Sequence, residues 1–214
     1  MSKGSILALK MGLFVLCLMP AAWLTLRVFG VWGLGLGANP IEELLHECGK
    51  WGLKILFVTL AVTPLRRLTG WNVLIRFRRM LGLFAFFYIL VHFLVYAGLD
   101  QRFDLQYIIE DVIERPYITL GMLGLILLIP LAVTSTNAMM RRLGKRWQKL
   151  HRLVYVIAIL GVWHFYWQVK QDILEPLIYA GILAALLGTR IYYRAKRNRN
   201  RQGVKIGGRV SEEG

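Results

Sequence analysis

The chain has 214 residues, of which 57% are hydrophobic, and a formal net charge of +15. The hydrophobic residues form long stretches separated by charged segments, whereas a soluble domain alternates apolar and polar residues along its helices and strands. This pattern excludes an ordinary soluble domain. It also argues against a nucleic-acid-binding protein, because the positive charge lies in short connections between apolar stretches. We therefore predict an all-α membrane protein.

Six stretches are long enough to cross the hydrocarbon core of a bilayer, which requires about 20 apolar residues in a helix. In chain order, we predict spans over residues 6–29, 51–68, 81–99, 117–136, 150–169 and 174–193. The first span lacks a small-x-small cleavage motif and is too long for a signal peptide, so we expect it to be retained. Residues 1–193 would then form one transmembrane domain, and the basic residues 194–214 a disordered or headgroup-bound tail. We find no internal repeat.

The distribution of charge predicts the orientation of these spans. Basic residues gather before the first span, between spans two and three, between spans four and five, and after span six. Every acidic residue except Glu212 and Glu213 lies in the opposite connections. Because lysine and arginine are concentrated in cytoplasmic loops, we predict that both termini are cytoplasmic.

The histidines within the apolar spans are the first candidates for chemistry, because ionisable side chains are costly in a membrane. His92 lies in the segment Ile-Leu-Val-His-Phe-Leu-Val, and His164 lies in Val-Trp-His-Phe-Tyr-Trp. At 1.5 Å per residue, they lie roughly 18 and 21 Å from the cytoplasmic ends of spans three and five. We predict that they are the axial ligands of one b-type haem near the outer face. The alternative is two histidines that bond only to backbone carbonyls or hydroxyls.

Two further histidines are less clearly placed. His151 lies at the cytoplasmic end of span five and would suit a second haem, but its expected partner position on span three, near Arg79, holds no histidine. The alternative is an interfacial histidine in a basic loop. His46 lies among three glutamates in the first outer connection, so we expect a solvated loop residue rather than a ligand. A role beside a quinone or at a partner docking site is the second interpretation.

The cytoplasmic connections supply candidates for binding anions. Arg76, Arg78, Arg79, Arg141 and Lys145 could contact the phosphate of FMN or haem propionates, since guanidinium groups suit such anions. The tendency of basic residues to lie in cytoplasmic loops explains the same residues without any ligand.

Several familiar motifs are missing from the sequence. Without Cys-x-x-Cys-His there is no covalent attachment of a c-type haem, and without a dinucleotide-binding glycine motif there is no nicotinamide domain. An electron carrier of this kind would therefore receive electrons from a membrane quinol or a separate flavoprotein. It would also pass them to a partner that reduces the final substrate.

Several longer motifs occur in a fixed order from residue 33 to residue 193. They are Gly-Ala-Asn-Pro, Thr-Pro-Leu-Arg-Arg, Arg-Arg-Met-Leu-Gly-Leu, Arg-Pro-Tyr-Ile-Thr-Leu-Gly, Thr-Ser-Thr-Asn-Ala-Met, Leu-Gly-Lys-Arg-Trp-Gln-Lys-Leu-His and Leu-Ile-Tyr-Ala-Gly. Together they resemble the MsrQ (YedZ) family, the haem-binding membrane subunits of the bacterial periplasmic methionine sulfoxide reductase system. This family belongs to the ferric-reductase-like membrane domains.

The resemblance implies b-type haem, bound FMN and a location in the bacterial inner membrane. It further implies electrons from the quinone pool or a cytoplasmic flavin reductase, and a periplasmic molybdopterin partner, MsrP. The family's membrane histidines match His92, His151 and His164, while the second span-three histidine of the wider superfamily is missing here. The alternatives are a stand-alone ferric or cupric reductase, a quinol-linked cytochrome b, and a haem-free membrane scaffold.

Overall fold

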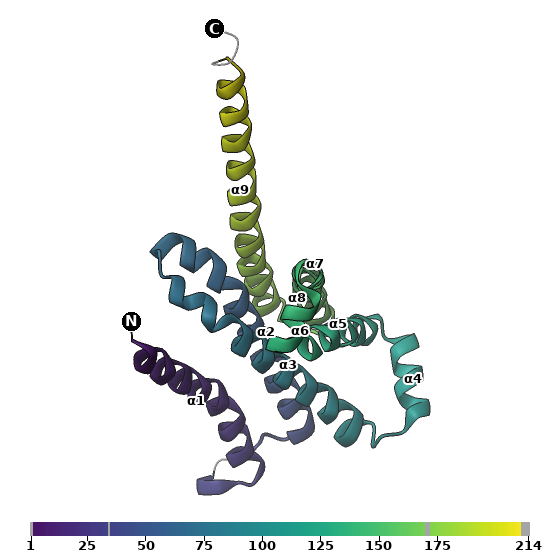
Figure 1. Ribbon diagram of the computed structural model, residues 1–214. Coiled ribbons are helices and arrows are strands. Elements are labelled where there is room, and N and C mark those ends of the chain that lie inside the picture. The colour runs from purple at the N-terminus through teal and green to yellow at the C-terminus, as the bar shows by residue number, and fades with distance from the viewer. Residues whose placement is uncertain (1, 34, 170–171, 211–214) are drawn as a thin grey trace.

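The computed structural model describes residues 2–33, 35–169 and 172–210, and within these residues all regular structure is helical (Figure 1). The helices are α1 (Lys3–Val28), α2 (Pro40–Thr69), α3 (Arg78–Val95), α4 (Leu105–Glu114), α5 (Pro116–Val133), α6 (Asn137–Leu143), α7 (Lys145–Leu150), α8 (Leu153–Gln168) and α9 (Leu174–Val210). Short 3₁₀ segments cover Val31–Gly33 and Asn72–Arg76, and a π-helical turn, Tyr96–Asp100, extends α3.

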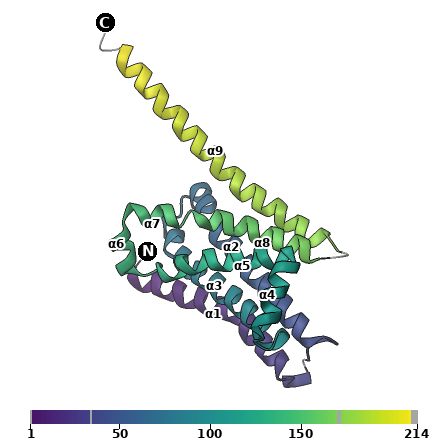
Figure 2. The same ribbon diagram turned by 90° about the vertical axis from the view of Figure 1, so that its right-hand side faces the viewer.

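In the described part of the chain, six helical segments are long and apolar enough to cross a membrane, which confirms the predicted all-α architecture. They are Gly4–Val28, Pro40–Thr69, Arg78–Asp100, Pro116–Val133, Lys145–Gln168 and Leu174–Lys196. Large apolar side chains such as Phe14, Leu123 and Ile159 are exposed on the outside of the bundle, where a soluble monomer rarely shows extensive apolar surface. In Figure 2, the N-terminus, α6, α7 and the C-terminal end of α9 lie at one end of the bundle, and α4 lies at the other.

Two helices differ from their predicted bounds. Helix α2 begins at Pro40, well before the predicted residue 51, because the Asn39 side chain caps its N-terminus and proline suits the first helical position. Glu42 and Glu43 in its first turn add favourable interactions with the helix dipole. Helix α9 continues to Val210, through most of the tail that we predicted to be disordered or bound to headgroups. The lysine, arginine and glutamine residues of the tail favour a helix, and the one proline of α9, Pro176, lies in its first turn.

The core lies between two helix pairs, α2 with α3 and α5 with α8, which form the most extensive interfaces of the bundle. Leu56, Leu60 and Tyr88 are almost fully buried there. The small side chains of Ala85 and Ala158 are also fully buried, which allows neighbouring helices to approach closely.

Helix α1 is attached to this core by the Tyr88 hydroxyl, which inserts between two backbone groups of α1. The Tyr88 hydroxyl on α3 donates to the Cys17 carbonyl at 2.8 Å and accepts from the Ala21 amide at 2.9 Å. In a regular helix these two backbone groups would bond to each other. The insertion lies next to Pro20, which already lacks one backbone donor, so Tyr88 satisfies groups that would otherwise be unpaired in lipid.

The orientation of the bundle is a testable prediction from charge. A fluorescent protein that matures only in the cytoplasm should be active when fused to the C-terminus, and a phosphatase that is active only in the periplasm should be inactive there. We expect this result because the basic connections lie at the same end as both termini. Phosphatase activity of the C-terminal fusion would overturn the predicted orientation.

Candidate functional site

His92 on α3 and His164 on α8 face each other inside the bundle. Their ring centroids are 6.0 Å apart and the ring planes are inclined by 80°. Both side chains are half-buried, and the segments on either side of them are apolar. The structure thus brings together the two histidines that the sequence placed at the same depth on different spans.

Each imidazole bonds through Nδ1 to a backbone carbonyl of a neighbouring helix. His92 Nδ1 lies 2.8 Å from the Leu45 carbonyl on α2, and His164 Nδ1 lies 2.6 Å from the Tyr117 carbonyl on α5. A carbonyl oxygen can only accept a hydrogen bond, so Nδ1 carries the proton in both rings. In the neutral tautomer, Nε2 then keeps a free lone pair, which is the state required of a metal ligand.

A glycine lies one helical turn after each of these carbonyls. A Cβ atom on Gly49 would lie 3.0 Å from His92 Nδ1, and a Cβ atom on Gly121 would lie 3.0 Å from His164 Nδ1. Both distances are tighter than ordinary van der Waals contacts. Glycine at these two positions therefore allows each ring to lie directly against the backbone of the neighbouring helix.

The two halves of this site are related by an internal repeat. An interval of 72 residues separates Leu45 from Tyr117, Gly49 from Gly121, and His92 from His164. The same interval separates Gly52 from Gly124 and Phe93 from Phe165. These matching intervals correct the prediction that the chain has no internal repeat. The α2–α3 pair and the α5–α8 pair each supply one histidine, one carbonyl and one glycine in matching geometry.

A polar network fixes the end of α5 from which the Tyr117 carbonyl projects. The Asp111 carboxylate accepts hydrogen bonds from Tyr96 at 3.0 Å and Gln101 at 3.1 Å, and forms a salt bridge of 3.2 Å with Arg115. The nearby Tyr117 hydroxyl and Asp111 carboxylate raise the pKa of the Arg115 guanidinium. This network holds the π-helical turn after α3 against the start of α5.

His46 does not lie in a loop, which corrects the interpretation from sequence. It lies in α2, is half-buried, and its Nε2 is 2.6 Å from Gln168 Nε2 at the end of α8. The capped start at Asn39 and Pro40 explains the difference, because it places the whole glutamate-rich segment in the helix. His46 thus joins α2 to α8 at the same end of the bundle as the histidine pair.

His151 lies apart from the pair, at the other end of α8. Its Nε2 is 3.1 Å from the Thr134 hydroxyl, and its ring stacks on Trp147 with centroids 3.9 Å apart. The position 72 residues earlier is Arg79, whose side chain bonds to Asn137. Within the described residues, therefore, no second pair of facing histidines is formed.

The cations proposed from sequence lie at the same end as His151 but differ in burial. Arg76, Arg79, Arg141 and Lys145 are exposed, whereas Arg78 at the start of α3 is half-buried. Arg190 on α9, which was not among the cations proposed from sequence, is half-buried and bonds to two other helices.

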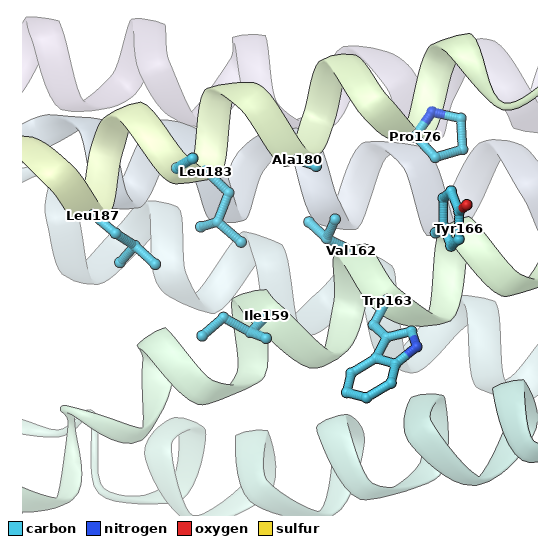
Figure 3. A pocket seen from close by; sticks show the side chains of 9 residues that line it. Ile159, Val162, Trp163, Tyr166, Pro176, Ala180, Leu183 and Leu187 are labelled. Atoms are coloured by element: carbon cyan, nitrogen blue, oxygen red, sulfur yellow. The ribbon is translucent and has the colours of Figure 1, made fainter.

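Two grooves on the outside of the bundle are lined by apolar side chains. One groove of about 400 Å³ lies between α8 and α9 and is lined by Ile159, Val162, Trp163, Tyr166, Pro176, Ala180, Leu183, Ala184 and Leu187 (Figure 3). Its lining contains no carboxylate, histidine or basic side chain. A second groove, of about 570 Å³ between α1, α2 and α3, is equally apolar. Neither groove presents a side chain that could ligate a metal.

Comparisons with known proteins agree on one family. The family described as "Ferric reductase like transmembrane component" matches residues 48–162. A relative from Rhodospirillum rubrum is 53% identical over 89% of this chain and 91% of its own length. A relative from Xanthomonas axonopodis is 51% identical over 89% of this chain and 89% of its own length. A relative from Xanthomonas euvesicatoria is 50% identical over 92% of this chain and 92% of its own length. All three are named "Protein-methionine-sulfoxide reductase heme-binding subunit MsrQ". No solved structure matches the chain.

Proposed function

The chain belongs to the ferric-reductase-like membrane family and, within it, to the MsrQ haem-binding subunits, and from this membership we propose that it carries electrons across a membrane to a methionine sulfoxide reductase. The proposed route starts at the quinone pool or a cytoplasmic flavin reductase, passes through b-type haem, and ends at a periplasmic molybdopterin enzyme, MsrP. The chain is a multi-pass membrane protein, and we propose the bacterial inner membrane as its location. It would act as the electron-transfer subunit, and its partner would reduce the oxidised methionine.

The facing imidazoles of His92 and His164 are the observation that carries this proposal. A metal–imidazole bond is about 2.0–2.1 Å long, so a metal held between two opposed rings separates their centroids by about 6 Å. The observed separation is 6.0 Å. The pair therefore fits the axial ligands of a haem iron.

The number of ligands also favours haem over a bare ion. Among the described residues, no group of three or more His, Cys, Asp and Glu side chains could hold a metal ion. A structural zinc site needs four protein ligands, whereas haem already supplies four nitrogens and needs two from the protein. A bound haem would supply a one-electron carrier within the apolar bundle.

The surroundings of each histidine prepare it for this role. The carbonyls of Leu45 and Tyr117 hold the Nδ1 protons, so each ring offers Nε2 as a neutral ligand in a fixed orientation. Gly49 and Gly121 provide the space in which each ring reaches its carbonyl. Neutral ligands in an apolar setting avoid the cost of placing additional charge inside the membrane.

Two further cofactor assignments complete the proposal. FMN would bind at the cytoplasmic end, where Arg76, Arg78, Arg79, Arg141 and Lys145 gather. A second haem at that end would have His151 as its histidine ligand, and its binding would require the bond between His151 and Thr134 to open. The family relationship, rather than a preformed histidine pair, supports this second haem.

Electron transfer to the partner is testable with purified proteins. Protein reduced with dithionite and freed of excess reductant should reoxidise at least about tenfold faster with the periplasmic molybdopterin enzyme than with ferric citrate at equal concentration. We expect this preference because a specific docking surface would bring the two centres together. Stopped-flow absorbance of the haem band measures both rates.

Ferric citrate and a non-partner periplasmic protein serve as the controls for this measurement. If ferric citrate is reduced faster and the molybdopterin enzyme does not react, the chain is a stand-alone metal reductase instead. If the purified protein shows no haem absorption and gives no pyridine haemochrome, electron transfer by haem is excluded.

A further inference from the structure

Arg190 on α9 lies inside the sixth span and contacts two other helices. It donates to the Leu60 carbonyl on α2 at 2.6 Å and to the Tyr155 hydroxyl on α8, and its guanidinium lies 4.7 Å from the centre of the Tyr155 ring. The Leu60 carbonyl is available because the residue four positions later is Pro64, which has no N–H to donate. Arg190 is thus built into a junction of three helices rather than extended from the surface.

The charge of Arg190 has no counter-charge in the part of the chain that the structure describes. Its two hydrogen-bond partners are neutral, and the other charged side chains that act on it are Arg67 and Arg78. None of these three arginines takes part in a described salt bridge. Arg78 and Arg190 are half-buried, whereas Arg67 is exposed and its guanidinium lies 5.0 Å from the centre of the Tyr193 ring. Like charges in a partly buried setting are unfavourable unless an anion joins them.

Unpaired hydrogen-bonding groups point to the same place. The buried side-chain nitrogen and oxygen atoms without a partner, among the described residues, are Arg190 Nε, Arg66 Nε and Thr63 Oγ1. Arg66 and Thr63 lie on the last turns of α2, close in sequence to the Leu60 carbonyl that Arg190 binds. The Arg66 guanidinium also bonds to Asn72, whereas Arg190 Nε lies at the junction itself. Buried donors without partners are rare in native proteins, so the unpaired Arg190 Nε indicates a missing acceptor there.

We propose that Arg190, with Arg67 and Arg78 beside it, binds a phosphate group at the inner ends of α2, α3, α8 and α9. A phosphate supplies both the negative charge and the several acceptor oxygens that the junction lacks, and the planar guanidinium binds it through paired N–H groups. The carboxylates of a haem held by His92 and His164 are too distant. Leu60 and Leu45 are 15 positions apart on α2, or about 22 Å along the helix.

Two molecules could bring this phosphate to the site: a phospholipid of the adjacent leaflet and FMN. The proposed site does not depend on the haem held by His92 and His164, because it involves different residues at the opposite end of the bundle. The FMN alternative shares Arg78 with the FMN site proposed above and rests on that proposal. The two sources differ chemically, since a phospholipid carries a phosphodiester and FMN carries a phosphomonoester with a fluorescent ring. An extract of the washed protein therefore distinguishes them.

The test compares bound phosphate in Arg190→Gln, Arg190→Lys and a matched control, Arg194→Gln. Arg194 is exposed one turn further along α9, so its replacement removes the same charge outside the junction. After exhaustive detergent washing, phosphorus per chain is measured, and phosphorus-31 NMR with flavin fluorescence identifies its source. Wild type and Arg194→Gln should retain about one tightly bound phosphate per chain, and Arg190→Gln about a tenth of that or less.

Arg190→Lys keeps the positive charge but loses the planar guanidinium with its paired N–H donors. It should therefore retain less phosphate than wild type and more than Arg190→Gln. Gel-filtration elution and the haem band of each variant report folding independently of phosphate. Equal retention by Arg190→Gln and Arg194→Gln, or no retained phosphate in wild type, would overturn the proposal. If Arg190→Gln fails to fold, full retention by Arg190→Lys would overturn it.

Discussion

Replacing His92 or His164 by alanine is expected to abolish the low-spin haem spectrum of the purified protein and electron delivery to the partner. Each substitution removes one of two opposed imidazoles whose centroids are 6.0 Å apart. The loss should exceed the 10–100-fold effect that is typical of removing a group that merely orients a ligand. Visible absorption, the pyridine haemochrome yield and electron paramagnetic resonance of the oxidised protein measure haem content and spin state.

The two remaining histidines provide controls. His151→Ala should leave this haem bound and low-spin, because His151 bonds to Thr134 and stacks on Trp147 at the other end of α8. His46→Ala should also leave the spectrum unchanged, since the His46 imidazole bonds to Gln168. A wild-type low-spin spectrum in both His92→Ala and His164→Ala would contradict the pairing, and His151 would then be the ligand to test.

The six spans could be predicted from sequence because lipid imposes a simple requirement on them. A backbone in the hydrocarbon core must satisfy its own hydrogen bonds, so about 20 apolar residues in a row form a helix almost regardless of detail. The matched depth of His92 and His164 follows from the same regular rise of 1.5 Å per residue. The depth of a residue in the membrane can therefore be predicted from sequence even where its contacts with other helices cannot.

The rest of the site depends on interactions that hydrophobicity does not reveal. The Leu45 and Tyr117 carbonyls are backbone atoms, so their side chains carry no signal of the bonds they accept. Gly49 and Gly121 are two of 21 glycines in the chain, and their role appears only when the neighbouring ring is placed. The interval of 72 residues was present in the sequence, but few identities mark it among interchangeable apolar residues.

Prolines explain a second class of contacts that sequence analysis missed. Pro64 removes the amide that would bond to the Leu60 carbonyl, and Arg190 from a distant helix takes its place. Next to Pro20, the Tyr88 hydroxyl inserts between the Cys17 carbonyl and the Ala21 amide. A sequence identifies the interrupted helix in such cases, whereas the partner comes from tertiary packing.

The repeat gives the histidine site approximate twofold symmetry. Each half consists of a helix pair that presents one imidazole, with the ring held by a carbonyl 47 positions earlier in the chain. Hydrogen bonds of 2.8 and 2.6 Å to backbone carbonyls fix the two imidazoles in the same tautomer. The two halves should therefore respond alike to equivalent substitutions, and this equivalence can be tested at the two glycines.

Gly49→Ala and Gly121→Ala should each weaken haem binding by about 10–100-fold and shift the reduction potential of the haem that remains bound. In both variants the new Cβ would lie 3.0 Å from an imidazole Nδ1, so the ring must move and its hydrogen bond to the carbonyl must lengthen. Because the two positions are equivalent in the repeat, the two effects should agree within about threefold. Haem titration of the apoprotein and redox titration of the bound haem measure them.

Gly124→Ala is the matched control, because it lies three residues after Gly121 on α5 and its Cβ would meet only Leu160 Cβ at 4.0 Å. Gly82→Ala is the control on α3, where the nearest atom would be Thr59 Cγ2 at 3.8 Å. Removing a glycine from a helix interior is worth roughly 0.5–1 kcal/mol, so both controls should bind haem normally and be slightly more stable. If Gly121→Ala matched Gly124→Ala in affinity and potential, the close contact between helix and ring would not govern the ligand. If only one of Gly49→Ala and Gly121→Ala weakened binding, the symmetric description would fail while the histidine pair itself could stand.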